Sequence, residues 1–153
     1  YLDNVSGWFN EQVAPDWMED RQKMMSLLQD EAELEEIVQM VGMDALSPAD
    51  RLKMEAARSI REDFLHQNSF HEVDTYTPLR KQYLMMKLVL AFYEQAMEAL
   101  SEGASMNALL GMDVREKIGR YKYTEKENVE SEYEKIMGEL AEEIKDAFGK
   151  EDF

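Results

Sequence analysis

The 153-residue sequence contains no cysteine. This excludes disulfide bonds, thiolate metal sites and cysteine nucleophiles, and it leaves the redox compartment undetermined. No apolar run approaches the roughly 18 residues of a membrane-spanning helix, so we expect no direct membrane insertion. No G-x-x-x-x-G-K-[ST] motif occurs, because the one Gly-Lys pair, Gly149-Lys150, is followed by Glu151. The chain therefore lacks a phosphate-binding loop of that kind.

Basic residues are few, with 17 Lys and Arg against 33 Asp and Glu and a formal net charge of −16. Such an acidic surface repels phosphate backbones, so we expect no nucleic-acid partner. It attracts basic protein partners, although the same charge can serve solubility alone. The length fits a single domain over residues 1–153. The chain starts at Tyr1 without a signal-peptide pattern, so we expect it to be a fragment of a longer protein.

Helical periodicity runs through most of the chain, and no segment shows strand-like alternation. Helices are predicted over 16–29, over 34–41 up to Gly42, from about 48 to 68, from 78 to about 103 and over 124–149. One or two short turns fall over 105–110. The apolar seam of the 78–103 helix consists of Tyr83, Met86, Leu90, Tyr93, Met97 and Leu100. The predicted fold class is all-α, a helical bundle of about five to six helices.

Local signals refine two of these helix boundaries. In the turn “GMDALSPAD”, residues 42–50, Ser47 can cap the next helix, Pro48 fits its first position and Asp50 suits its first turn. The turn holds no His, Lys or Arg, so it carries no catalytic chemistry of its own. Thr124 and Glu127 predict a capping box for the last helix. A glycine inside that helix, at 138, predicts fraying or a kink.

Candidate site residues are sparse. Asp63-x-x-His66 resembles half of a carboxylate-bundle metal motif, but the other histidine, His71, does not complete a second copy, so we predict no metal site. Phe70 and Tyr76 lie in a loop over residues 67–77. They either pin that loop onto the core or form a flat apolar slot for a ring-shaped ligand. The pattern alone leaves two function classes, an interaction module and a helical piece of a larger enzyme.

Several long stretches carry a resemblance to a known family. They are “YLDNVSGWFNEQVAPDW” at 1–17, “SIREDFLHQNSFHEVDTYTPLRKQY” at 59–83 and “LLGMDVREKIGRYKYTEKE” at 109–127. With the rest of residues 27–100, they resemble the C-terminal helical domain of the catalytic A (alpha) subunit of archaeal-type (A/V-type) ATP synthases, which are H⁺-transporting ATPases. The resemblance spans most of the chain, and the 59–83 segment looks closest.

The resemblance implies a mechanical role for the turn. The family is homologous to the F-type catalytic β subunit, and “GMDALSPAD” falls where that subunit carries its DELSEED loop. The implied rotor-contact positions are Met43, Asp44, Ala45, Leu46, Ser47, Pro48, Ala49 and Asp50. Ala45, Pro48 and Ala49 replace acidic positions of DELSEED. We therefore expect a steric push on the rotor rather than an acidic attraction to it.

The same resemblance implies that Phe70 and Tyr76 wall the adenine pocket of a site for ATP or ADP with Mg²⁺. The phosphate-binding loop, its lysine and the catalytic glutamate lie upstream in the family, so this chain is expected to hold no catalytic residue, to bind no nucleotide alone and to be inactive alone. The implied partners are non-catalytic B subunits in an alternating hexamer and central-stalk rotor subunits. The implied place is the cytoplasmic, inner face of the cell membrane, peripherally attached. The rival interpretation is a free-standing acidic helical adaptor.

Overall fold

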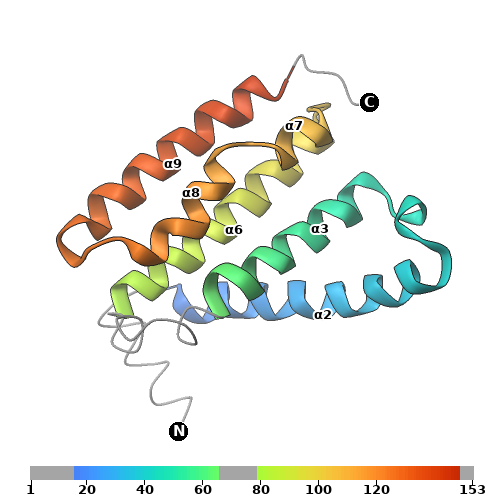
Figure 1. Ribbon diagram of the computed structural model, residues 1–153, viewed down its shortest axis with the longest axis horizontal. Helices are drawn as coiled ribbons and strands as arrows, with labels where there is room; N and C mark the ends of the chain where they lie inside the picture. Colours follow the sequence, from blue (N-terminus) through green and yellow to red (C-terminus); the bar gives the residue numbers. More distant parts are fainter. Residues whose placement is uncertain (1–15, 66–78, 149–153) are drawn as a thin grey trace, which may run out of the picture.

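The computed structural model describes residues 16–65 and 79–148, and these form an all-α arrangement with no strand among them (Figure 1). The fold class predicted from the sequence is thereby confirmed. The elements are α2 (Trp17–Val41), the 3₁₀ turn η1 (Met43–Ala45), α3 (Pro48–Ser59), the π-helical turn η2 (Ile60–Leu65), α6 (Leu79–Ser101), α7 (Met106–Leu110), α8 (Val114–Arg120), the 3₁₀ turns η3 (Tyr121–Tyr123) and η4 (Lys126–Asn128), and α9 (Val129–Asp146).

Helix α6 is the centre of the fold, in contact with α2, α3, α8 and α9. Its sequence from Leu84 to Phe92 is apolar almost all round, which is typical of a helix covered on several sides. The seam predicted for α6 was too narrow. Residues outside it are also buried, namely Leu84, Met85, Leu88, Val89, Phe92, Ala96 and Ala99. A seam describes a helix with one covered face, whereas α6 has neighbours on opposite sides.

Helices α2 and α3 form an antiparallel hairpin, joined at the end of the molecule that lies at the right in Figure 1. The two periodic segments predicted before Gly42 are one continuous helix, α2, and it ends where the sequence indicated. Met24 and Leu27 of α2 join the main core with Leu52 of α3. Leu34 is buried but lies outside that core cluster, so the outer part of the hairpin is held mainly by its own contacts.

The C-terminal half packs α8 and α9 against α6. The phenol of buried Tyr121 donates a 2.6 Å hydrogen bond to the carbonyl of Val129 and so ties η3 to the start of α9. The predicted capping box was wrong, because α9 begins only at Val129 and has no side-chain hydrogen bond at its N-cap. The chain is extended at Thr124, whose carbonyl accepts a 2.8 Å hydrogen bond from the buried Lys81 ammonium. Helix α9 then continues without interruption through residue 138 to Asp146.

Candidate functional site

The turn between α2 and α3 begins at Gly42, whose backbone conformation ends α2. Gly42 has φ 90° and ψ 168°, a region that side chains with a Cβ rarely adopt, and its N–H donates a 2.8 Å hydrogen bond to the Val38 carbonyl. The chain then makes the single 3₁₀ turn η1, in which the N–H of Leu46 donates to the Met43 carbonyl at 3.0 Å. The side chain of Leu46 is buried, and it anchors this turn to the rest of the hairpin.

The far side of the turn is fixed by the start of α3. Ser47 Oγ accepts a 3.2 Å hydrogen bond from the N–H of Asp50, and Pro48 occupies the first helical position. Both features were predicted from the sequence and are confirmed. They satisfy helix-end N–H groups and restrict the backbone, so the entry into α3 is stiff.

Arg51, in the first turn of α3, contacts this turn, and the sequence interpretation missed it. Its Nη2 atom donates to the Met43 carbonyl at 3.4 Å and lies 3.3 Å from Asp44 Oδ1. Its Nε atom is buried without a hydrogen-bond acceptor among the described residues. The Asp44 side chain is fully exposed. The Asp44 carboxylate is therefore already paired within the chain, which reduces its capacity to attract a basic partner.

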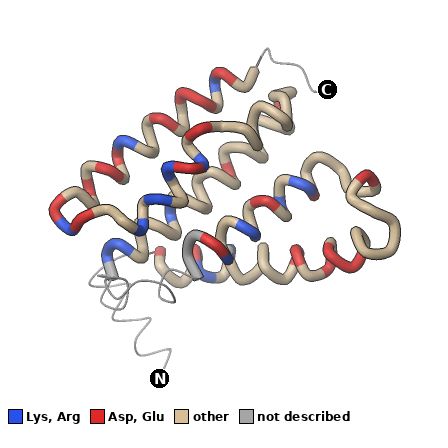
Figure 2. Tube along the Cα trace, viewed as in Figure 1, with Lys and Arg blue, Asp and Glu red and all other residues tan. Residues whose placement is uncertain are grey.

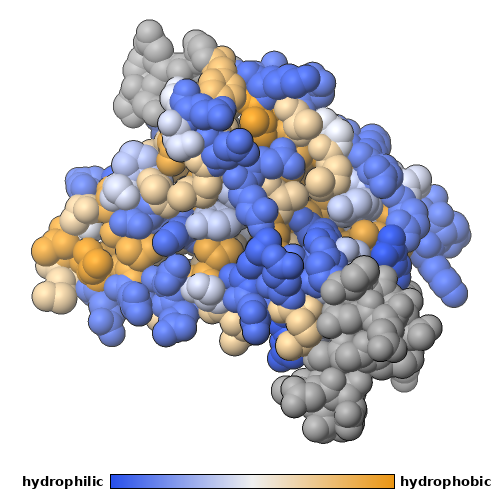
Figure 3. Space-filling view, turned by 180° about the vertical axis from the view of Figure 1, so that it is seen from behind, coloured by the Kyte–Doolittle hydropathy of each residue, from blue (hydrophilic) through white to orange (hydrophobic). Residues whose placement is uncertain are grey.

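Four large apolar side chains are exposed around this turn, and we call them the apolar tip. They are Ile37, Met40, Val41 and Met43, with exposed fractions of 42%, 83%, 64% and 46%. The view from behind shows hydrophobic residues gathered at the left end of the molecule, where the hairpin ends (Figure 3). Met40 and Val41 lie just before the range 43–50 expected from the resemblance. The apolar tip thus overlaps that range only at Met43 and lies otherwise at the end of α2.

Acidic side chains flank the apolar tip on α2 (Figure 2). The exposed members of this group are Glu33, Glu35 and Glu36. Nearer the core, ion pairs join the two arms of the hairpin. Lys53 Nζ of α3 lies 3.4 Å from Asp30 Oδ2, and Arg61 Nη2 of η2 lies 2.6 Å from Glu31 Oε2. These cross-links make the two arms one unit, which presents the apolar tip at its end.

The two residues expected to contact adenine, Phe70 and Tyr76, lie outside the described residues, and so does His66 of the rejected metal motif. The adenine assignment stays a prediction. Within the described ranges, no group of three or more His, Asp or Glu side chains is placed to hold a metal ion. No described helix combines the length and the apolarity needed to cross a bilayer.

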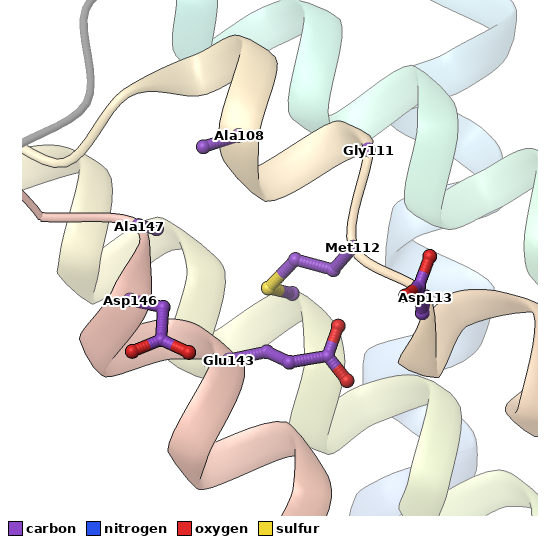
Figure 4. Close-up of a pocket in the computed structure, with 7 residues that line it drawn as sticks. All are labelled: Ala108, Gly111, Met112, Asp113, Glu143, Asp146 and Ala147. Carbon is purple, nitrogen blue, oxygen red and sulfur yellow. The ribbon is translucent and has the colours of Figure 1, made fainter.

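A hollow of about 360 Å³ lies between the α7–α8 connection and α9 (Figure 4). It is lined by Ala108, Gly111, Met112, Asp113, Glu143, Asp146 and Ala147. The acidic groups dominate its polar wall, and no basic side chain lines it. Glu143 has a structural task there, because its Oε1 accepts a 3.2 Å hydrogen bond from the N–H of Val114 at the start of α8. This acidic wall is unsuited to phosphate, so the hollow is no nucleotide site.

The chain is similar to alpha chains of V-type ATP synthases along almost its whole length. Residues 6–110 match the family model described as the C-terminal domain of V and A type ATP synthase. The V-type ATP synthase alpha chain of Acetivibrio thermocellus is 55% identical over 151 residues, which cover 99% of this chain and 26% of the relative. The proteins of the same name from Clostridium botulinum and Clostridioides difficile are 54% and 49% identical over 150 residues.

The chain spans about a quarter of the length of these relatives, and they match it almost from end to end. The relatives are bacterial, so they leave the archaeal part of the expectation untested. The family resemblance read from residues 1–17, 59–83 and 109–127 is confirmed. By the family model and by these identities, the chain belongs to the family of C-terminal domains of the alpha chains of V- and A-type ATP synthases.

Proposed function

We propose that this domain transmits nucleotide-driven motion to the central rotor of a rotary ATP synthase or ATPase, and that the apolar tip and residues 43–50 make the rotor contact. The observation that carries the proposal is the apolar tip itself. Large apolar side chains gathered on an exposed surface indicate a contact with another protein. Met40 is 83% exposed and Met43 46%. Methionine is unbranched and adaptable, which suits a surface that meets successive faces of a turning partner.

The stiffness of the turn supports a steric push. The Ser47 cap, Pro48 at the first position of α3 and the hydrogen bond from Arg51 to the Met43 carbonyl all restrict the backbone between α2 and α3. Charge contributes little, since Asp44 is paired with Arg51 and alanine or proline stands at three of the five acidic positions of DELSEED, which leaves Asp50 as the other acidic one. Helix α2 has 25 residues. At 1.5 Å per residue it is about 37 Å long, enough to carry a movement from one end of the domain to the other.

The nucleotide part of the proposal rests on the family resemblance. Phe70 and Tyr76 would wall the adenine pocket, while ATP or ADP and Mg²⁺ would be held by the upstream nucleotide-binding domain. Phosphoryl transfer depends on a phosphate loop, on its lysine and on the metal ion. This chain has no such loop, so the domain alone would be inactive. Coupling between nucleotide state and rotor contact would act equally in both directions, because linkage is reciprocal.

The proposed partners are non-catalytic B subunits in an alternating hexamer and the rotor subunits of the central stalk. The proposed location is peripheral, on the cytoplasmic face of the cell membrane. The relatives are all named as alpha chains of V-type ATP synthases and are about four times as long as this chain. They favour a domain of a rotary complex over a free-standing acidic adaptor. A phosphate-binding loop upstream in the full-length protein would favour it further.

The test is the double variant Met40→Ser, Met43→Ser in the assembled complex, reconstituted in vesicles. Full burial of a Met side chain contributes about 1.5–3 kcal/mol. Scaled by the exposed fractions, removing both side chains costs the contact roughly 2–4 kcal/mol. We expect ATP hydrolysis to persist while the ions transported per ATP fall.

Met25→Ser is the matched control, because Met25 lies on the same helix, is 57% exposed and is far from the apolar tip. We expect this variant to transport normally. An unchanged ratio of ions to ATP in the double variant would refute the proposed rotor contact. So would an equal loss in the double variant and in the Met25 control.

A further inference from the structure

An ionic cluster lies at the opposite end of α2 from the apolar tip, and we call it the α2 clamp. It consists of Asp16 and Asp20 at the start of α2 and of Tyr83 and Lys87 on α6. The Lys87 ammonium lies 2.7 Å from Asp20 Oδ2 and donates to Asp16 Oδ2. The Tyr83 hydroxyl donates to Asp16 Oδ1 at 2.9 Å. One ammonium and one phenol therefore hold both carboxylates of the first turns of α2.

The surroundings make this cluster tighter than an ordinary surface ion pair. Asp20 is only 3% exposed. Burial alone would lower the pKa of Lys87, but the hydrogen bonds to Asp16 and Asp20 outweigh it and hold the pKa above its usual range. Burial likewise acts to raise the pKa of Asp16, and the hydrogen bonds from Lys87 and Tyr83 reverse this and lower it. Lys87 and Asp16 thus stay charged at neutral pH, whereas burial raises the pKa of the Asp20 carboxyl above its usual range. A partly buried charge holds its partner closely.

The α2 clamp lies where two parts of the chain enter the described domain. Asp16 directly follows residues 1–15, and Tyr83 lies in the second turn of α6, close after residues 66–78 in the sequence. Those two ranges are the ones that the family resemblance connects with the nucleotide-binding domain. The apolar tip begins about 30 Å away along α2, at 1.5 Å per residue. The α2 clamp therefore lies at the N-terminal end of α2, and the proposed rotor contact lies at its C-terminal end.

Near the base of α2, its N-terminal end, Met24 and Leu27 are buried in the core, and Trp17 and Leu28 pack against it while partly exposed. Apolar contacts are non-directional, so they resist separation of two helices better than they resist sliding. Hydrogen-bonded ion pairs have a defined geometry and resist both. Removing the Lys87 charge would leave α2 packed on α6 and would keep the Tyr83–Asp16 hydrogen bond, but the ion pairs to both carboxylates would be lost and the resistance to sliding would fall.

We propose that Lys87 is a positioning residue that fixes the base of α2 to α6, so that motion entering at the nucleotide end of the domain reaches the apolar tip. This inference rests on the proposed function.

The experiment uses the assembled complex with Lys87→Met, which keeps the length of the side chain and removes its charge. The matched control is Lys23→Met, since Lys23 also joins α2 to α6, through a 3.1 Å ion pair with Glu94, but at an exposed position. We expect Lys87→Met to hydrolyse ATP while ions transported per ATP fall by about twofold to 30-fold, the range for substitutions that alter coupling between sites. Lys23→Met should transport normally, and Lys87→Arg should restore most of the ratio.

A purely structural role predicts a different result. Hydrolysis and transport would then fall together with the melting temperature while their ratio stayed constant, and this outcome overturns the inference. If Lys87→Met fails to assemble, Asp16→Asn takes its place, because it keeps the Lys87–Asp20 pair. A partial loss of the ratio is then expected, and an unchanged ratio overturns the inference.

The apolar tip variants separate this inference from the proposed function. If Met40→Ser, Met43→Ser uncouples the enzyme and Lys87→Met does not, the α2 clamp has no positioning role and the rotor contact stands. If the double variant leaves the ratio unchanged, the proposed function fails, and this inference fails with it.

Discussion

Gly42→Ala is a sharp test of the structural argument for the turn, because it isolates backbone conformation. Gly42 has φ 90° and ψ 168°, and a Cβ placed there would meet no atom within 4 Å. Any loss of stability must therefore come from the strain of a positive φ and not from a steric clash with neighbouring atoms. Residues with a Cβ held in such regions cost of order 1–3 kcal/mol.

The glycine at position 138 offers a control of opposite sign. It lies within α9 without a positive φ, and a Cβ there would also meet nothing within 4 Å. Replacing a glycine by alanine inside a helix stabilises by about 0.5–1 kcal/mol. At roughly 2–4 °C per kcal/mol for a chain of this size, Gly42→Ala should lower the melting temperature by about 2–12 °C and Gly138→Ala should raise it by about 1–4 °C.

The assay is thermal and urea unfolding of the 153-residue chain with each substitution, followed by hydrogen exchange. The strain should appear locally, as faster exchange of the backbone N–H groups of residue 42 and of Leu46, which are hydrogen-bonded to the carbonyls of Val38 and Met43. If Gly42→Ala is as stable as the parent, or shifts stability in the same direction as Gly138→Ala, the reasoning about the turn is refuted.

Four further outcomes are expected. The isolated chain should show no Mg²⁺-dependent ATP hydrolysis, and turnover abolished by a mutation within it would contradict this. Asp44→Asn should change the number of ions transported per ATP by less than about twofold, because an exposed ion pair is weak. If this change alone uncoupled ATP hydrolysis from ion transport, a steric contact would be contradicted. In the assembled subunit, Tyr76→Ala should weaken ATP affinity by roughly fivefold to 150-fold if the ring stacks on adenine, and Tyr76→Phe should change the affinity little. Unchanged ATP binding with a lower melting temperature would indicate a ring that only anchors its loop. Burial raises the pKa of Tyr83 to about 12, so its phenol ionises first in the unfolded chain, and stability should fall as pH rises from about 10 to about 12. Tyr83→Phe should make that fall less steep, and an unchanged slope would contradict this assignment.

Much of the local structure could be predicted from the sequence, because it depends on backbone chemistry within a few residues. The stop of α2 at Gly42 and the start of α3 at Ser47 and Pro48 are examples. A positive φ, a capping hydroxyl and a missing N–H act through neighbouring atoms, whatever the rest of the fold does. The capping box at Thr124 failed for the complementary reason. Its backbone there is held in an extended conformation, with the carbonyl bound by Lys81 of α6, which lies 43 positions away in the chain.

Burial at the apolar tip was decided by the tertiary structure alone. Leu34 and Val41 belong to one periodic pattern on α2, yet Leu34 is covered and Val41 is largely exposed. Periodicity shows which residues share a face, but it does not show where the neighbouring helix ends. The α2 clamp was equally invisible, since Asp16 and Lys87 are 71 positions apart. The sequence therefore determined the helices and the stiff turn. Packing decided which apolar side chains remain exposed and which charges pair across the fold, because exposure and charge pairing depend on atoms that only folding brings together.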